Sequence, residues 1–252
     1  MASGLALDHA AWSSPWRLRS VRDKGVLSGS LLIAAISLPP FPGGASVAAI
    51  SAALLLGPIR VGVVRLLRIL WLPMASIVIG VATVAVSLSW DGGLNAQITA
   101  PGLAMAAALA VRALAATLAM FTLACSTPMV DLFSALRKAR VPGALVEIAA
   151  LVYRFTFSLL ESVGAIHHAQ EARLGYINRK AAMRSASMGV AVLFTRTWDQ
   201  ARRLEDGLAG RGYEDALRTM EPDRLRSGVF LLSSVAVVAA VVGTSLLWGY
   251  ST

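Results

Sequence analysis

The chain has few charged residues, one cysteine and three histidines, and each scarcity excludes a class of protein. Only 15% of its 252 residues are charged and 56% are hydrophobic, which excludes an ordinary soluble domain and indicates several membrane spans. The single cysteine, Cys125, cannot form a disulfide framework or a thiolate metal site. The net charge of +9 comes from basic residues that flank apolar runs, so we expect no nucleic-acid binding.

The sequence also lacks the motifs of membrane enzymes and ATPases. It has no glycine-rich phosphate loop followed by Lys and Ser or Thr, so we expect it not to hydrolyse ATP. It has no nucleophile elbow or histidine-rich ligand set near its apolar runs, so we assign no catalytic residues. His167 and His168 are helical neighbours that point about 100° apart. We therefore expect them not to chelate one ion together, and we expect no metal site.

Five runs are apolar enough to cross a bilayer, which takes about 20 residues of helix. They cover residues 26–40, 43–59, 66–89, 101–125 and 229–248. The first two are short and are joined by a Pro- and Gly-rich cluster, so we expect a tight hairpin. The predicted fold class is therefore all-α: a polytopic membrane protein with about five transmembrane helices and a cytoplasmic helical domain.

Basic residues indicate how these spans are oriented. The N-terminal segment and residues 60–68 are basic, whereas the connections at 39–44 and 90–100 contain no Lys or Arg. Cytoplasmic loops are enriched in Lys and Arg, so we expect the N-terminus and the basic region 126–228 in the cytoplasm. The predicted divisions are a cytoplasmic N-terminal segment, four spans, cytoplasmic helices, and a last span with the C-terminus (residues 1–25, 26–125, 126–228 and 229–252).

A further apolar segment, residues 142–166, is predicted to stay out of the membrane core. A crossing there would place the basic residues at 137–140 on the outer side. Glu147, Arg154 and Glu161 recur every seven residues and so share one helical face. A charge at the bilayer centre costs about 2.5–3.5 kcal/mol. We therefore expect this helix to lie along the cytoplasmic boundary or beneath the spans.

The cytoplasmic region is predicted to contain three helices. The first begins at Thr127-Pro128 and stops at Val141-Pro142-Gly143. The second runs from about Ala144 to Arg173, and a polar linker at 178–184 leads to a third at about 186–211. Apolar residues at helical spacing predict the buried stripes of the second helix (Leu145, Ile148, Val152, Phe155, Leu159 and Ile166) and of the third (Val190, Leu193, Ala201, Leu204 and Leu208).

Two similar motifs lie at the ends of these long helices. They read Ala172-Arg173-Leu174-Gly175-Tyr176 and Ala209-Gly210-Arg211-Gly212-Tyr213. Glycine ends a helix in the left-handed conformation, so each arginine should project from a helix C-terminus. Its planar group of donors suits carboxylates and carbonyls of a partner. The alternative is a C-terminal cation beside a glycine cap, but the repetition favours a protein that docks into two similar sockets.

One charge, Arg112, lies near the middle of the fourth predicted span. An intramembrane charge is a candidate functional residue. The alternative is a structural pairing with a backbone carbonyl or a polar group of a neighbouring span.

These residues together resemble the transmembrane T component of energy-coupling factor transporters, and within it the cobalt-type Q subunits (CbiQ family). The likeness extends over nearly the whole chain and is carried by residues 7–12 with Lys24, Thr127-Pro128 with Asp131, Val141-Pro142, Tyr153-Arg154-Phe155 and the two arginine motifs. The family pattern at the arginines is Ala-Arg-Gly or Ala-Arg-Ser. This chain differs in having Leu174 after the first arginine and Gly210 before the second.

The resemblance implies a non-catalytic scaffold in the cell inner membrane. Arg173 and Arg211, with Ala172, Leu174, Gly210 and Gly212 beside them, would each dock in a groove of one of two ATP-binding cassette ATPase subunits. The spans would hold a membrane substrate-binding subunit and, in the cobalt type, a small accessory subunit. ATP and magnesium would be bound by the ATPases and cobalt by the substrate-binding subunit, with no cofactor in this chain. The alternatives are a T component for a vitamin such as biotin, or a stand-alone secondary transporter.

Overall fold

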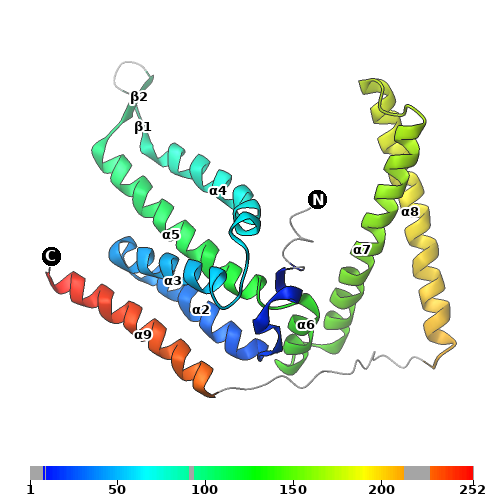
Figure 1. Cartoon of the computed structure of the whole chain (residues 1–252). Helices are drawn as coiled ribbons and strands as arrows, with labels where there is room; N and C mark the ends of the chain where they lie inside the picture. The colour runs from blue at the N-terminus through cyan, green and yellow to red at the C-terminus, as the bar shows by residue number, and fades with distance from the viewer. Residues whose placement is uncertain (1–7, 9, 91–93, 213–227, 252) are drawn as a thin grey trace. The chain divides into compact units, whose positions relative to one another are not determined.

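The computed structural model describes residues 8, 10–90, 94–212 and 228–251, and helices dominate them (Figure 1). This confirms the predicted all-α, polytopic class. The chain divides into two units, the first formed by Met1–Leu132 with Pro222–Thr252 and the second by Phe133–Glu221.

The first unit is a helical bundle with a small two-stranded ribbon. It contains α2 (Val21–Ser37), α3 (Ala45–Leu56), α4 (Val63–Ala85), β1 (Val86–Trp90), β2 (Leu94–Ile98), α5 (Ala100–Ala124) and α9 (Gly228–Ser251). The second unit contains α7 (Gly143–Ala172) and α8 (Arg179–Ala209), and the boundary falls within α6 (Met129–Lys138).

Helix α5 is the central helix of the first unit and packs against α2, α3 and α4, while α9 packs against α2. Small residues allow the close approach: Ala115 and Ala119 are fully buried, and the Ser28 hydroxyl of α2 donates to the Ala119 carbonyl at 2.6 Å. Such small-residue contacts are typical of helices that pack in a membrane.

The short hairpin predicted near the N-terminus is present as α2 and α3. Helix α2 ends at Ser37 before Pro39, and a kinked segment, Pro40–Gly44, with extended backbone at Phe41, leads into α3. A Cβ added to Gly43 would lie 2.6 Å from the Leu38 Cβ, so only glycine fits at this turn. Helix α2 starts at Val21, five residues before the predicted start of the first span, and its first turn contains Arg22, Asp23 and Lys24.

The ribbon is a departure from the predicted loop at 90–100. Strands β1 and β2 pair antiparallel, with Val86 opposite Ile98 and Trp90 opposite Leu94. The sequence Val-Ser-Leu-Ser-Trp alternates apolar and polar residues, which favours a strand over the last turn of a helix. The third predicted span therefore ends at Ala85 instead of residue 89.

Among the described residues, four helices are long and apolar enough to cross a membrane. They are Val63–Ala85, Ala100–Ala124, Gly143–Ala172 and Gly228–Ser245, and a shorter apolar stretch covers Pro40–Leu56. The protein is thus a multi-pass membrane protein. The third of these helices, α7, is the segment expected to stay outside the membrane; it packs beside α8 in the second unit. The count of five crossings stays a prediction.

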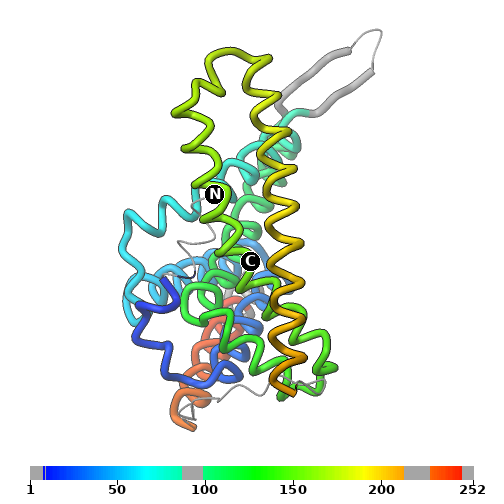
Figure 2. The backbone as a smooth tube through the Cα atoms, turned by 90° about the vertical axis from the view of Figure 1, so that its right-hand side faces the viewer, coloured from blue at the N-terminus to red at the C-terminus, as the bar shows by residue number. Residues whose placement is uncertain are grey.

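The second unit is an antiparallel hairpin of α7 and α8 (Figures 1 and 2). The helices have 30 and 31 residues, so each is about 45 Å long. The expected polar linker at 178–184 is wrong, since α8 already begins at Arg179. The Asn178 side chain caps this helix by accepting a hydrogen bond from the Ala181 amide at 2.8 Å.

The hairpin buries less apolar surface than predicted. Val190 and Ala201 of α8 are exposed, whereas Leu193, Leu204 and Leu208 are half-buried. On α7 the first half of the predicted stripe is exposed (Leu145, Ile148 and Val152) and the second is half-buried (Phe155, Leu159 and Ile166). Where α7 and α8 pack mainly against each other, each helix covers only a narrow strip of its neighbour, so the rest of a wide apolar face stays exposed.

Candidate functional site

The first arginine motif forms the turn between α7 and α8. Helix α7 ends at Ala172 and Arg173 is its exposed C-cap residue. The left-handed residue is Leu174, with φ 59°, which corrects the expectation that Gly175 would adopt this conformation. Glycine is needed at 175 for another reason: an added Cβ would lie 2.6 Å from the Ser185 Oγ and 2.8 Å from the Gln170 carbonyl oxygen.

Side chains from both helices fix this turn. The Ser185 hydroxyl donates to the Gly175 carbonyl at 2.8 Å, and the Gln170 Nε2 donates to the Ser185 carbonyl at 2.7 Å. The Tyr176 hydroxyl donates to the Gln170 Oε1 at 2.7 Å, and the Tyr176 ring stacks on His167 with ring centres 4.7 Å apart. Arg173 therefore extends from a turn whose backbone is held by tertiary hydrogen bonds.

In the second arginine motif, the hydrogen bonds among the described residues lie within the end of α8. Gly210 is the C-cap residue, and its amide donates to the Asp206 carbonyl at 3.0 Å. The Arg211 amide donates to the Leu208 carbonyl at 3.1 Å, and Gly212 takes the left-handed conformation with φ 68°, as predicted. These hydrogen bonds all run to the last turn of α8, so Arg211 is an exposed residue at a simple helix end. Tyr213 lies outside the described residues.

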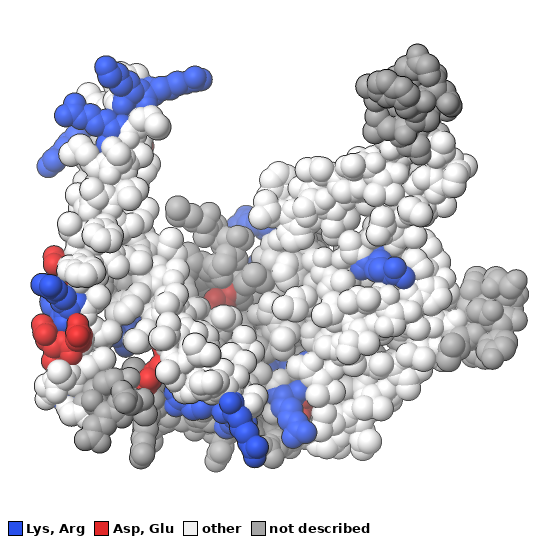
Figure 3. Space-filling model, turned by 180° about the vertical axis from the view of Figure 1, so that it is seen from behind, with Lys and Arg blue, Asp and Glu red and all other residues white. Residues whose placement is uncertain are grey.

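The two arginines lie at opposite ends of α8. Its 31 residues, at 1.5 Å each, separate the ends by about 46 Å. The charge around them differs (Figure 3). The turn end exposes four basic residues and one glutamate (Arg173, Arg179, Lys180, Arg184 and Glu171), whereas the far end has equal numbers of both signs (Asp199, Arg202, Arg203, Glu205, Asp206 and Arg211).

Arg112 pairs with a backbone carbonyl inside the first unit. Its Nη2 donates to the Leu38 carbonyl at 3.2 Å, and the Nε is buried with no hydrogen-bond partner among the described residues. Leu38 is the C-cap residue of α2, where the helix dipole attracts a cation. This geometry corresponds to the structural alternative for Arg112, because it joins α5 to the end of α2.

A buried lysine connects α2 to the segment between α5 and α6. Lys24 is 2% exposed, and its Nζ donates to the Ser126 carbonyl at 2.9 Å. Sequence analysis named Lys24 only among the residues that carry the family resemblance and predicted no contact for it. The available signal was its position directly before an apolar run, which places it within the first turns of α2.

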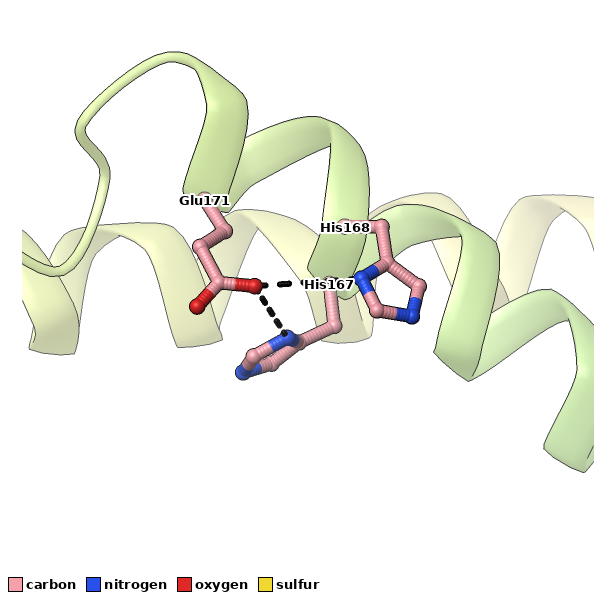
Figure 4. Close-up of side chains that lie close together, drawn as sticks. All are labelled: His167, His168 and Glu171. Atoms are coloured by element: carbon pink, nitrogen blue, oxygen red, sulfur yellow. Dashed lines mark ion pairs between the residues drawn. The ribbon is translucent and has the colours of Figure 1, made fainter.

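The last turns of α7 bring three possible metal ligands together. His167 and His168 are both exposed, and the Nδ1 of each lies 3.8 Å from the Glu171 Oε2 (Figure 4). The expectation that the two histidines cannot bind one ion together was based only on the angle between their side chains. The structure adds Glu171, which lies within reach of both.

Comparison with known proteins assigns the chain to one group of transporters. A family model described as cobalt transport protein, CbiQ, matches residues 13–223. The chain is 38% identical to a cobalt transport protein CbiQ of Rhodobacter capsulatus over 96% of this chain and 98% of the relative. It is 31% identical to a cobalt transport protein CbiQ of Salmonella typhimurium over 75% of this chain and 88% of the relative.

A third relative is a longer protein. The chain is 34% identical over 58% of its length to a putative fused cobalt transport protein, CbiMQ, of Methanocorpusculum labreanum. The match covers 24% of that protein, so most of the fused chain has no counterpart here.

Proposed function

Since this chain belongs to the CbiQ family of cobalt transport proteins, we propose that it is the coupling subunit of an ATP-driven cobalt importer of the energy-coupling factor class. In this role it hydrolyses no ATP. It transmits movements of two partner ATPase subunits to a membrane subunit that binds the substrate.

The observation that carries the proposal is the pair of exposed arginines at the two ends of one hairpin. Arg173 and Arg211 lie about 46 Å apart along α8, too far for one small groove to hold both. A pair of identical ATPases offers two equivalent grooves, and each arginine can donate in a bidentate manner to a carboxylate there. Movement of the two ATPases would then act on both ends of one rigid helix.

The first unit would face lipid and the substrate-binding subunit. Helix α4 presents large exposed apolar side chains, among them Val64, Leu67, Trp71 and Ile79. Such a surface is stable only against lipid or another apolar protein surface. The fused relative supports a membrane partner from the same transport system, because its printed name combines an M and a Q part. ATP with magnesium and the transported cobalt would be bound by the partner subunits.

Movement of the second unit would be transmitted to the first unit through the contact between Lys24 and Ser126. Ser126 lies between α5 and α6, and the buried ammonium of Lys24 ties its carbonyl to α2. A displacement of α6 would therefore act on α2 and α5 together. Lys24 is a positioning residue in this proposal.

The two alternative functions receive less support. The family matched by the chain is a cobalt family, which favours cobalt over a vitamin as the substrate class. A secondary transporter would need a site for its substrate near the middle of the membrane. Arg112, the charge expected there, binds the end of α2 instead.

Assembly and uptake test the proposal together. The chain is co-expressed with its ATPases and membrane partners, and the double variant Arg173→Ala/Arg211→Ala is compared with Arg196→Ala, which changes an exposed arginine nearer the middle of α8. We expect the double variant to lose copurification of the ATPases and ATP-driven cobalt uptake, and the control to retain both. Normal assembly and uptake in the double variant would refute the docking role.

A further inference from the structure

The side chains of His167, His168 and Glu171 form a compact group on the last turns of α7 (Figure 4). One ligand atom from each residue lies within 4.8 Å of the others. The two distances from an imidazole Nδ1 to the Glu171 Oε2 are both 3.8 Å. Glu171 follows His167 by four residues and His168 by three, so one helical turn places the carboxylate beside both rings.

These separations are close to those of a metal site. Ligand atoms bound to one ion at about 2.0–2.1 Å lie roughly 3 Å apart. The two His–Glu pairs are therefore within about 1 Å of the bound geometry, and the two histidine ligand atoms, no more than 4.8 Å apart, are within about 2 Å of it. Rotations of exposed side chains supply shifts of this size. His168 and Glu171 are free to make this shift, because their side chains are 84% and 63% exposed. The His167 ring is already oriented by stacking on Tyr176.

The donor set selects the class of ion. Two imidazole nitrogens and one carboxylate oxygen suit Co²⁺, Ni²⁺ and Zn²⁺, whereas Mg²⁺ and Ca²⁺ prefer oxygen ligands throughout. Three protein ligands on one exposed face leave the remaining coordination positions to water. Such an arrangement binds reversibly and is exposed to ions in solution.

We propose that His167, His168 and Glu171 form a peripheral binding site for a divalent late first-row metal ion beside Arg173. This site is separate from the one that holds the transported ion, which belongs to a partner subunit. Its separation from the transport site and its location relative to the membrane rest on the proposed function: if the hairpin is cytoplasmic, the site takes ions that have already been imported.

A metal titration of the isolated subunit tests the proposal. The full-length chain, without a polyhistidine tag and in detergent, is titrated with Co²⁺ and followed by visible absorption and calorimetry. We expect one equivalent to bind, Ni²⁺ and Zn²⁺ to displace it, and Mg²⁺ to leave it in place. No ATPase is present, so a failure of the docking proposal does not affect this result.

Matched variants assign the site. His168→Ala and Glu171→Gln should each weaken binding by about tenfold or more, since even the loss of an outer partner of a ligand costs about 10–100-fold. Glu205→Gln, which changes an exposed glutamate at the far end of α8, should bind like the unmodified chain. Absence of Co²⁺ binding, or binding unchanged in both His168→Ala and Glu171→Gln, would overturn the proposal.

Discussion

Each end of the α7–α8 hairpin carries an arginine, but the hydrogen bonds around the two arginines differ. At one end Arg173 follows a helix whose turn is fixed by Gln170, Ser185 and Tyr176. At the other end, the hydrogen bonds that the described residues make around Arg211 run to the last turn of α8. A contact made by an ordered group costs less conformational entropy on binding. Two arginine motifs of similar sequence therefore need not contribute equally to docking.

The ends also differ in charge. The turn end is basic, whereas the far end balances acidic and basic residues. An acidic groove would therefore be attracted more strongly to the turn end at low salt. Both differences favour the same end, so the Arg173 motif is expected to dock more tightly than the Arg211 motif.

The largest effect should come from removing the arginines one at a time. A charge-assisted contact contributes about 1.5–3 kcal/mol, which corresponds to roughly 10- to 150-fold in affinity. We expect Arg173→Ala to weaken ATPase binding toward the upper part of this range and Arg211→Ala toward the lower part. Binding of a purified ATPase to each variant by calorimetry measures the difference. Equal losses would show that the order of the turn makes no contribution.

Replacing each arginine by lysine should distinguish the contribution of positive charge to ATPase binding from that of the planar guanidinium group. Lysine keeps the positive charge but cannot donate two parallel hydrogen bonds to one carboxylate. We expect both Arg173→Lys and Arg211→Lys to recover less than half of the binding free energy lost in the alanine variants. Full recovery at either end would indicate that the partner recognises charge alone.

Two glycine substitutions should break the ends by different mechanisms. In Gly175→Ala the new Cβ would collide with the Ser185 Oγ and the Gln170 carbonyl, and overpacking of this kind costs about 1–3 kcal/mol. In Gly212→Ala the space is open, but a left-handed alanine costs about 1–2 kcal/mol. Each variant should weaken docking at its own end. To check this, Gly175→Ala is combined with Arg173→Ala, and Gly212→Ala is combined with Arg211→Ala.

Gly207→Ala provides the control for these two substitutions. Gly207 lies inside α8 with open space around its Cα, so alanine should stabilise the helix by about 0.5–1 kcal/mol. ATPase binding should stay unchanged. A loss of binding in this variant would mean that alanine substitutions on α8 disturb docking regardless of position.

The smallest effect is expected from Tyr176→Phe. It removes the hydrogen bond to the Gln170 Oε1 and keeps the ring that stacks on His167, at a cost of about 1 kcal/mol. We expect slightly weaker docking at the turn end, measured by calorimetry. The same variant combined with Arg173→Ala should show no further loss, because the arginine that the turn orients is already absent.

The sequence predicted the helical class and the positions of both arginines because these depend on local signals. Apolar runs mark the spans, and Gly212 marks the end of α8. The role of Gly175 could not be predicted, since it depends on Ser185 of the next helix. The start of α8 was misplaced although Asn178 is a strong helix cap, because the polar composition of 178–184 was interpreted as a linker.

Other features depended on contacts that only the fold provides. The burial of Lys24 arises because α2 begins at Val21 and brings its first turns against the end of α5. Fewer residues of the apolar stripes of α7 and α8 are buried than the sequence predicted. The periodicity of apolar residues shows which side of a helix is apolar, but it does not show how much of that side a neighbouring element covers. The position of Arg112 was predictable, whereas its carbonyl partner was not.

Site-specific crosslinking tests the central claim, that each end of the hairpin binds its own ATPase subunit. The single native cysteine, Cys125, is fully buried, so Leu174→Cys and Gly210→Cys add accessible thiols beside the two arginines. In the assembled complex, each variant should crosslink to one ATPase, and a chain with both substitutions should carry two. Thr195→Cys, exposed near the middle of α8, should form no crosslink. Absence of crosslinks at both ends, or equal crosslinking at Thr195→Cys, would contradict the account.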